Sequence, residues 1–335
     1  MDYGSLIGDA WRMTWRHRFL WVLGLFAGGA SGLSFGNGGG GGDFSSVFDG
    51  AGNGSRGRSG SGGSVDAGFA EAGRWLGEHV WLIILGVLLL VLIGLVLFAL
   101  SFVAQGGLAG ASADLGSGRP SSFRSAVRTG QRLFWRYVGL WLVLVAFGLA
   151  FLLVLAVVVG SIVLLTMAVE QKAWVIIPSV LFGIVLFIVG VIFAVVAGIV
   201  VAFAKRAIPV LDIGPLAALA EGWRVMRARP GTALLVWLLD LALGFGTSIV
   251  VAIVALFLLL VLAMPVLIAW FGLKMDGSAM LYPAIGYGVV AGVLWFAVLL
   301  FLSAVVNTFH WNYWTLAYLR LRLDPAENVA QVTPT

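Results

Sequence analysis

The sequence contains no cysteine and little charge. The absence of cysteine from 335 residues excludes disulfides, thiol nucleophiles and cysteine-ligated metals. Charged residues make up 10% of the chain and hydrophobic residues 61%, whereas soluble domains average about 25% charged residues. This balance is typical of a protein solvated largely by lipid. No stretch between the apolar segments is long enough to form a second, water-soluble domain.

Recognisable catalytic and metal-binding patterns are also missing. The three histidines form no HExxH pattern, and no Ser/His/Asp arrangement has a recognisable spacing. A GxGxxG pattern fits the glycine run Gly36–Gly41, but no strand is predicted before it and no Walker lysine follows it. The net charge of +5 reflects membrane topology rather than nucleic-acid binding. We therefore predict a non-enzymatic protein with no metal, no cofactor and no nucleic-acid partner.

Long apolar segments dominate what is present. About 20 apolar residues span a bilayer as one helix, and six segments qualify: Phe19–Gly36, Trp81–Gln105, Trp135–Val169, Ala173–Ala204, Thr232–Phe271 and Pro283–Tyr318. The sequence thus predicts an all-α integral membrane protein with six transmembrane helices. The fifth segment would be about 60 Å long as a straight helix, twice the ~30 Å hydrocarbon core, so we expect it to tilt, bend or project into the interface.

Basic residues fall on alternate sides of these segments. Of the 20 lysines and arginines, 15 lie before the first span, between the second and third, between the fourth and fifth, and after the sixth. Since positive charge marks the cytoplasmic side, we predict that both termini are cytoplasmic. Arginine outnumbers lysine 17 to 3, which favours a GC-rich bacterial source and hence the bacterial plasma (inner) membrane.

The connections divide the chain simply. Residues 31–68 are dominated by Gly, Ser, Asn and Asp, a composition that predicts a disordered extracytoplasmic tether. We predict one membrane domain over residues 1–323, with this loop inside it, and a cytoplasmic tail over residues 324–335.

The cytoplasmic segments resemble each other. Tyr3–Arg16, Phe123–Arg136 and Pro215–Arg227 each place a small residue two positions before an arginine and then enter an apolar span. We predict three repeated units, each a cytoplasmic amphipathic helix followed by a transmembrane hairpin. This recurrence argues against the alternative that the N-terminus is a cleaved signal peptide.

Helices of this kind lie in the headgroup plane. They act as structural collars, as docking sites or as mobile gates, and the sequence leaves these three alternatives open. Candidate lipid-headgroup contacts are Arg12, Arg16, Arg132, Arg136, Arg224 and Arg227.

Asp240 is the only acidic residue well inside an apolar run. An intramembrane carboxylate usually faces a partner or a cavity. His310, Asn307 and Gln105 lie at a matching depth, about 14–17 Å from the cytoplasmic charges, so we expect Asp240 within hydrogen-bond reach of one of them. These residues form either a helix–helix clamp or a proton- or solute-handling cluster. The third alternative is that Asp240 is wetted at the interface.

Several short motifs carry a family resemblance. The opening Ala10–Phe26 resembles uncharacterised bacterial membrane proteins. Together with Gln105–Leu108, Gly222–Arg224 and the closing Leu316–Arg322, it is similar to the glycerophosphoryl diester phosphodiesterase membrane-domain superfamily. That name comes from fusions to a catalytic barrel, which this sequence lacks, so the resemblance implies a helical membrane domain without phosphodiesterase activity.

Together these observations favour a non-enzymatic multi-pass inner-membrane protein that acts through contacts with membrane lipids or other membrane proteins. The alternative is a transporter or permease of a small solute or ion that uses the polar cluster around Asp240. An intramembrane lipid-modifying enzyme is less supported, because no nucleophile–base pair is evident. The sequence predicts no oligomeric state.

Overall fold

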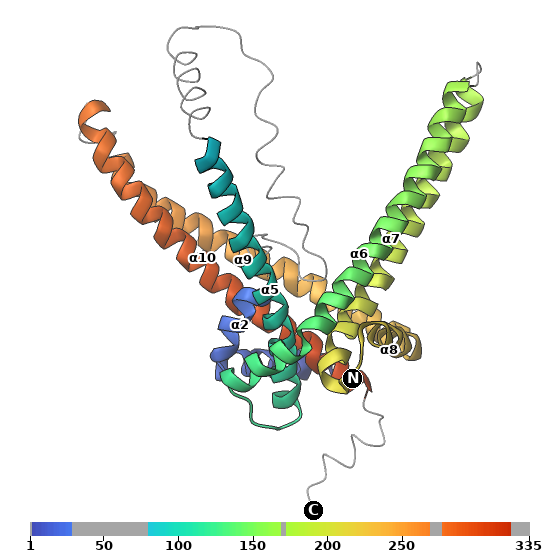
Figure 1. Cartoon of the computed structure of the whole chain (residues 1–335), viewed down its shortest axis with the longest axis horizontal. Coiled ribbons are helices and arrows are strands. Elements are labelled where there is room, and N and C mark those ends of the chain that lie inside the picture. Colours follow the sequence, from blue (N-terminus) through green and yellow to red (C-terminus); the bar gives the residue numbers. More distant parts are fainter. Residues whose placement is uncertain (1, 29–79, 169–171, 269–276, 323–335) are drawn as a thin grey trace, which may run out of the picture.

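The computed structural model describes residues 2–28, 80–168, 172–268 and 277–322, and every element in these ranges is a helix. The helices are α1 (Tyr3–Arg16), α2 (Phe19–Ala27), α5 (Val80–Gly116), α6 (Phe123–Ala168), α7 (Lys172–Leu211), α8 (Pro215–Ala228), α9 (Pro230–Leu267) and α10 (Gly277–Arg322) (Figure 1). The predicted loop at 31–68 and tail at 324–335 lie outside the described residues.

Five of these helices are long and apolar enough to cross a membrane: α5, α6, α7, α9 and α10. In the most apolar stretch of each, between 0% and 22% of the residues are buried inside the protein, so their surfaces suit a lipid environment. The predicted first span, Phe19–Gly36, is described only as far as Gly28. Its described helix, α2, has nine residues, which is shorter than a bilayer crossing requires.

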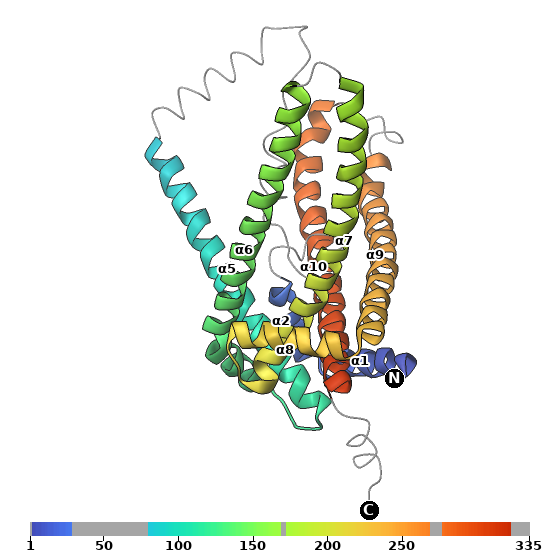
Figure 2. The ribbon, with the colours of Figure 1, turned by 90° about the vertical axis from the view of Figure 1, so that its right-hand side faces the viewer.

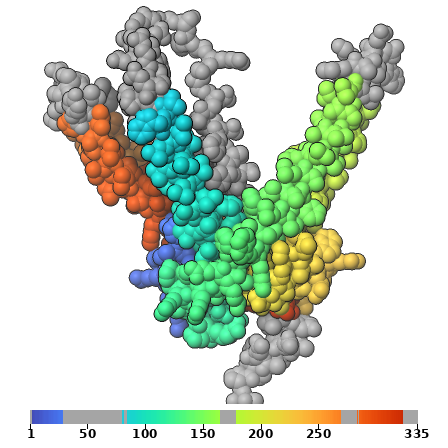
Figure 3. Space-filling view, in the orientation of Figure 1, coloured from blue at the N-terminus to red at the C-terminus, as the bar shows by residue number. Residues whose placement is uncertain are grey.

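The long helices diverge from one end of the molecule. α6 and α7 run together as one arm, and α9 and α10 form another (Figure 1). The space-filling view shows the arms meeting at one end only (Figure 3). At that end α1 and α8 lie across the feet of the long helices (Figure 2). We call this end the base: α1, α2 and α8 with the adjoining ends of α5, α6, α7 and α10.

The hydrophobic core of the protein sits in the base. Its largest fully buried side chains include Tyr137, Phe203, Tyr313 and Tyr318, contributed by α6, α7 and α10. A second cluster joins α2 to α5 and α6, through residues such as Leu20 and Leu108. Close packing of these side chains joins the helices to one another, so the base holds the arms together.

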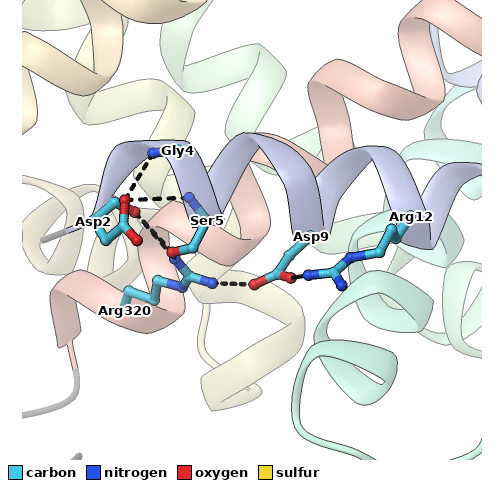
Figure 4. A network of polar contacts seen from close by, with 6 residues as sticks. All are labelled: Asp2, Gly4, Ser5, Asp9, Arg12 and Arg320. Atoms are coloured by element: carbon cyan, nitrogen blue, oxygen red, sulfur yellow. Dashed lines mark hydrogen bonds and ion pairs between the residues drawn. The ribbon is translucent and has the colours of Figure 1, made fainter.

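Polar contacts fix the N-terminal part of the first helix. The Asp2 carboxylate caps α1 by accepting hydrogen bonds from the backbone amides of Gly4 at 3.0 Å and Ser5 at 3.3 Å. The bond from Ser5 lowers the pKa of the Asp2 carboxyl below its ordinary value of 3.8. Arg320, at the end of α10, donates to the Ser5 hydroxyl at 3.0 Å and to the Asp9 carboxylate (Figure 4). The first and last described helices are therefore tied together.

Glycine allows two very close helix crossings in the base. A Cβ atom at Gly130 in α6 would overlap the carbonyl oxygen of Val103 in α5. One at Gly222 in α8 would overlap the carbonyl oxygen of Val200 in α7. Small residues let membrane helices approach to backbone contact, and both glycines are required for the packing seen here.

The second expected amphipathic helix is not a separate element. Residues 123–136 join the following span in one unbroken helix, α6. Helix α1 ends at Arg16, because the next residue, His17, has φ −117° and ψ 73°, which break the helical path. Helix α8 ends at Ala228, followed by Arg229 with φ −142° and ψ 69° and then by Pro230. No proline or comparable break follows Arg136, so the helix continues.

Candidate functional site

A buried, hydrogen-bonded pair of polar side chains joins α9 to α10. The His310 Nδ1 and an Asp240 carboxylate oxygen lie 2.7 Å apart, and the two residues are 8% and 1% exposed. One turn before Asp240, the Val236 carbonyl accepts a hydrogen bond from the Tyr313 hydroxyl at 2.9 Å. Two polar contacts therefore fix the same interface between these helices. Such contacts hold membrane helices in register.

The other two residues predicted to accompany Asp240 lie elsewhere. The Gln105 side chain donates to the Ser101 hydroxyl on its own helix at 3.2 Å. Asn307 lies against Gly28 at the end of α2, where a glycine Cβ would overlap its amide nitrogen. The structure therefore brings together Asp240 and His310, and it does not gather all four residues into one cluster.

Arg206 of α7 lies beside this pair, 5% exposed. Its guanidinium carbon is 4.3 Å from the centre of the Trp311 ring, a cation–π contact, and one terminal nitrogen donates to the Ala202 carbonyl at 2.8 Å. The guanidinium also interacts electrostatically with Asp240. Its Nε is buried without a hydrogen-bond partner, and no carboxylate of the described residues lies within ion-pair distance. A positive charge is thus held in the core mainly by aromatic rings.

A buried hydrogen-bond chain crosses three helices of the base. The Ser112 hydroxyl donates to the Asn312 side-chain oxygen at 2.6 Å, and the Asn312 amide donates to the Thr14 hydroxyl at 2.9 Å. The Thr14 hydroxyl in turn donates to the Ala10 carbonyl at 2.8 Å. Because the chain connects α5, α10 and α1, it fixes the base as one unit.

Most of the predicted headgroup arginines are engaged with carboxylates. Arg12 pairs with Asp9 at 2.5 Å and Arg224 with Glu221 at 2.9 Å. Arg136 pairs with Asp212 at 2.5 Å, and Arg132 lies 3.7 Å from the same carboxylate. Both Arg12 and Arg224 keep side chains that are 77% exposed, so these pairs are solvated and weak.

Five arginines of the base are exposed and have no ion-pair or hydrogen-bond partner among the described residues. They lie on α1, at the start of α2, and on α6 and α8: Arg16, Arg18, Arg124, Arg128 and Arg227. Their charges are available to an external anion. Arg16 and Arg227 are among the predicted headgroup contacts, and the sequence prediction left out the other three.

Two hollows adjoin at the foot of α6. One, of about 230 Å³, lies between α5, α6, α7 and α10 and is lined by polar residues including Asp114, Arg119 and Thr129. The other, of about 470 Å³, is open and is lined by Ser125, Arg128, Thr129 and Arg132. Neither hollow is lined by Asp240 or His310. No cluster of three metal-ligating side chains occurs in the described parts of the chain.

Sequence reasoning missed two central residues. Arg206 follows Lys205 directly after an apolar run, so it looks like a cytoplasmic anchoring charge, and its burial depends on α10. Asn312 lies in the aromatic-rich stretch that ends α10, where the sequence indicates interfacial packing. The available signal was the spacing of Thr308, Asn312 and Thr315 at i, i+4 and i+7, which places three polar side chains on one face of a helix.

The fold and these contacts define a class: an α-helical membrane protein whose diverging spans are locked together by a polar and aromatic base. Over residues 9–324 the chain matches a family of unknown function (DUF7544), and it belongs to that family. Comparison with curated proteins and with solved structures gave no match. Membership in the glycerophosphoryl diester phosphodiesterase membrane-domain superfamily is not shown by these comparisons.

Proposed function

We propose that this protein is a non-enzymatic multi-pass protein of a bacterial inner membrane, whose base binds the headgroups of anionic lipids at the cytoplasmic surface. The observation that carries the proposal is the set of exposed arginines on the base, including Arg16, Arg128 and Arg227, that have no partner among the described residues. Each arginine near an anionic leaflet contributes about 1 kcal/mol of attraction.

Six crossings with both termini in the cytoplasm fit the described helices. Ala27 packs in one cluster with Ala104, whereas α5 begins at Val80, 24 residues and about 36 Å earlier along the helix. Ala27 and Val80 therefore lie at opposite ends of α5. Their separation along α5 is comparable to the ~30 Å hydrocarbon core, which supports a sixth crossing.

We also infer that the chain contains three repeated units. The buried positions of the three base segments have the same spacing: Leu6 and Ala10 in α1, Ala126 and Gly130 in α6, and Ala218 and Gly222 in α8. The two glycines approach the preceding span in the same way, each at a carbonyl and at the amide nitrogen four residues further along. This agreement supports a common ancestral unit of a base helix followed by a transmembrane hairpin. In the second copy the base helix, residues 123–136, is continuous with the following span.

A transporter that uses Asp240 is the second candidate, favoured by the burial of three ionisable side chains, Asp240, His310 and Arg206. Against it, the pair makes a direct bond between α9 and α10, and the residues lining the two hollows do not include it. We therefore assign the pair to a structural clamp. A liposome flux assay that showed pH-dependent solute movement, lost on replacement of Asp240, would favour the transporter instead.

Lipid retention tests the proposed function. The protein is reconstituted in nanodiscs that contain equal amounts of phosphatidylcholine and phosphatidylglycerol, extracted in mild detergent, and examined by native mass spectrometry. We expect phosphatidylglycerol to be enriched in the wild type and its enrichment to fall in Arg16→Gln/Arg227→Gln. The matched control is Lys172→Gln, which removes a positive charge at the opposite end of α7. Equal retention of the two lipids by wild type would contradict the proposal.

A further inference from the structure

We propose that the foot of α6 carries a discrete site for the phosphate group of an anionic lipid, formed by Arg128, Thr129 and Arg132 with Arg119 opposite. This inference rests on the proposed function and deepens it, because it assigns one recognition site within a generally basic surface. Three observations support it: the geometry of the α6 face, the state of its charges, and the apolar side chains beside it.

The polar residues of α6 share one face. Ser125, Arg128, Thr129 and Arg132 are spaced at i, i+3, i+4 and i+7, and they line one open hollow. Thr129 and Arg132 also line the adjoining hollow, which Arg119 enters from the α5–α6 connection. A phosphate group between the two hollows would therefore meet guanidinium groups from two segments of the chain, and charge-assisted hydrogen bonds of this kind are strong.

The charges of this face are incompletely neutralised. Arg128 has no partner among the described residues, and Arg132 lies 3.7 Å from Asp212, whose carboxylate is held at 2.5 Å by Arg136. Arg119 pairs with Asp114 at 2.8 Å, but its side chain is 69% exposed. Among the residues lining the two hollows, three arginines face one carboxylate. This excess of positive charge suits a phosphate anion.

The two hydroxyl groups of this face differ in whether they are engaged. The Thr129 hydroxyl makes no hydrogen bond in the described structure, so it is available to a phosphate oxygen. The Ser125 hydroxyl is already engaged, since it donates to the Ser122 carbonyl at 2.8 Å, and we assign it no role.

Exposed apolar side chains beside the site favour a lipid over a soluble ligand. Trp135 is 77% exposed and lies seven residues after Arg128, on the same side of α6, and Phe123 is 45% exposed near its start. Aromatic side chains at a membrane protein surface gather at the headgroup level. The phosphate site is thus placed where a lipid headgroup meets its acyl chains.

The test compares arginine variants in the full-length protein by native mass spectrometry with phosphatidylglycerol. We expect Arg128→Gln/Arg132→Gln to weaken retention of the most tightly bound phosphatidylglycerol about a hundredfold, because two charge-assisted bonds are lost and each contributes about tenfold. Arg128→Lys/Arg132→Lys keeps the charge but loses the two-pronged geometry, so it should recover only part of the binding. Thr129→Val, which keeps the side-chain volume, should weaken binding less than the double glutamine variant.

Controls separate this site from the general proposal. Arg16→Gln/Arg227→Gln should lower overall lipid enrichment while leaving the most tightly bound lipid in place. If Arg128→Gln/Arg132→Gln binds phosphatidylglycerol as wild type does, the site is refuted, whereas the proposed function still stands or falls with the Arg16/Arg227 variant. Displacement of the bound lipid by excess inorganic phosphate, with no preference for phosphatidylglycerol over phosphate, would also overturn the lipid assignment. Thermal melting of each variant verifies that the exposed substitutions leave the fold intact.

Discussion

Replacing Asp240 with leucine tests whether the buried pair is a clamp. The substitution keeps the volume of the side chain and removes the carboxylate that lies 2.7 Å from His310. Since both residues are almost fully buried, the His310 ring then loses its partner in a site with little access to solvent. A buried polar group left unpaired costs about 1–3 kcal/mol, although hydrogen bonds between membrane helices average about 0.6 kcal/mol.

The second effect of this substitution concerns Arg206. Its guanidinium interacts electrostatically with the Asp240 carboxylate and has no ion-pair partner among the described residues. Removing the carboxylate therefore leaves a positive charge in the core with only its cation–π contacts and its hydrogen bond to the Ala202 carbonyl. We therefore expect the total loss of unfolding free energy in Asp240→Leu to lie toward the upper part of the range of about 1–3 kcal/mol. Asp240→Asn retains an acceptor for His310 and should lose less.

The assay is thermal unfolding in detergent, followed by intrinsic tryptophan fluorescence. We expect the melting temperature to fall in the order wild type, Asp240→Asn, Asp240→Leu, with no pH-dependent solute flux in liposomes for any of the three. An Asp240→Leu protein that melts at or above the wild-type temperature would refute the clamp. An equal fall in both variants would show that the charge, rather than the hydrogen bond, is what stabilises the interface.

Three further predictions follow from the base. Gly130→Ala should destabilise the folded protein by about 1–3 kcal/mol, because its Cβ would overlap the Val103 carbonyl. Gly148→Ala on the same helix is the control: its Cβ meets no atom within 4 Å, so it should be neutral. The melting temperatures of the two variants check this. Because the pKa of Asp2 is lowered, its cap stabilises α1 above pH 3.8, and this stabilisation is lost as the pH falls through the folded-state pKa. At that pH, hydrogen exchange of the amides in the first turn of α1 should become faster, and the difference in stability between wild type and Asp2→Asn should disappear. Burial, assisted by the positive charge of Arg16, lowers the pKa of His17 below 6.5. Protonation of His17 therefore destabilises the folded connection between α1 and α2 as the pH falls below that value. An NMR titration that gave a pKa above 6.5 would contradict this.

The sequence predicted how far along its helix each polar residue lies, but not which side of the helix its side chain faces. The rise per residue placed Asp240 level with His310, and these two side chains are in contact. Asn307 and Gln105 lie at comparable depth, yet they face α2 and Ser101 respectively. Which way a helix faces depends on packing against elements far away in the sequence, and an apolar helix in lipid carries little amphipathic signal to reveal it.

The predicted helix boundaries agree with the structure where the sequence contains a helix-breaking residue. Pro230 follows Arg229 and separates α8 from α9, as the repeat predicted. The same repeat predicted a separate helix at residues 123–136, because it compared residue types and did not ask what would end that helix. The burial of Arg206 was beyond sequence reasoning, since it depends on the Trp311 ring, 105 residues further along the chain.

The divergence of the arms from the base has a mechanical consequence. Leu140 is the last fully buried side chain of α6, and the helix continues to Ala168, about 42 Å further. Because the arms meet at one end only, a small rotation at the base produces a larger displacement at the far end of each arm. A rotation of about 5° at the base would carry the far end of α6 by about 4 Å, given that length. Binding of a single lipid headgroup at the N-terminal end of α6 would therefore move the other end of the helix sideways, at the opposite face of the bilayer.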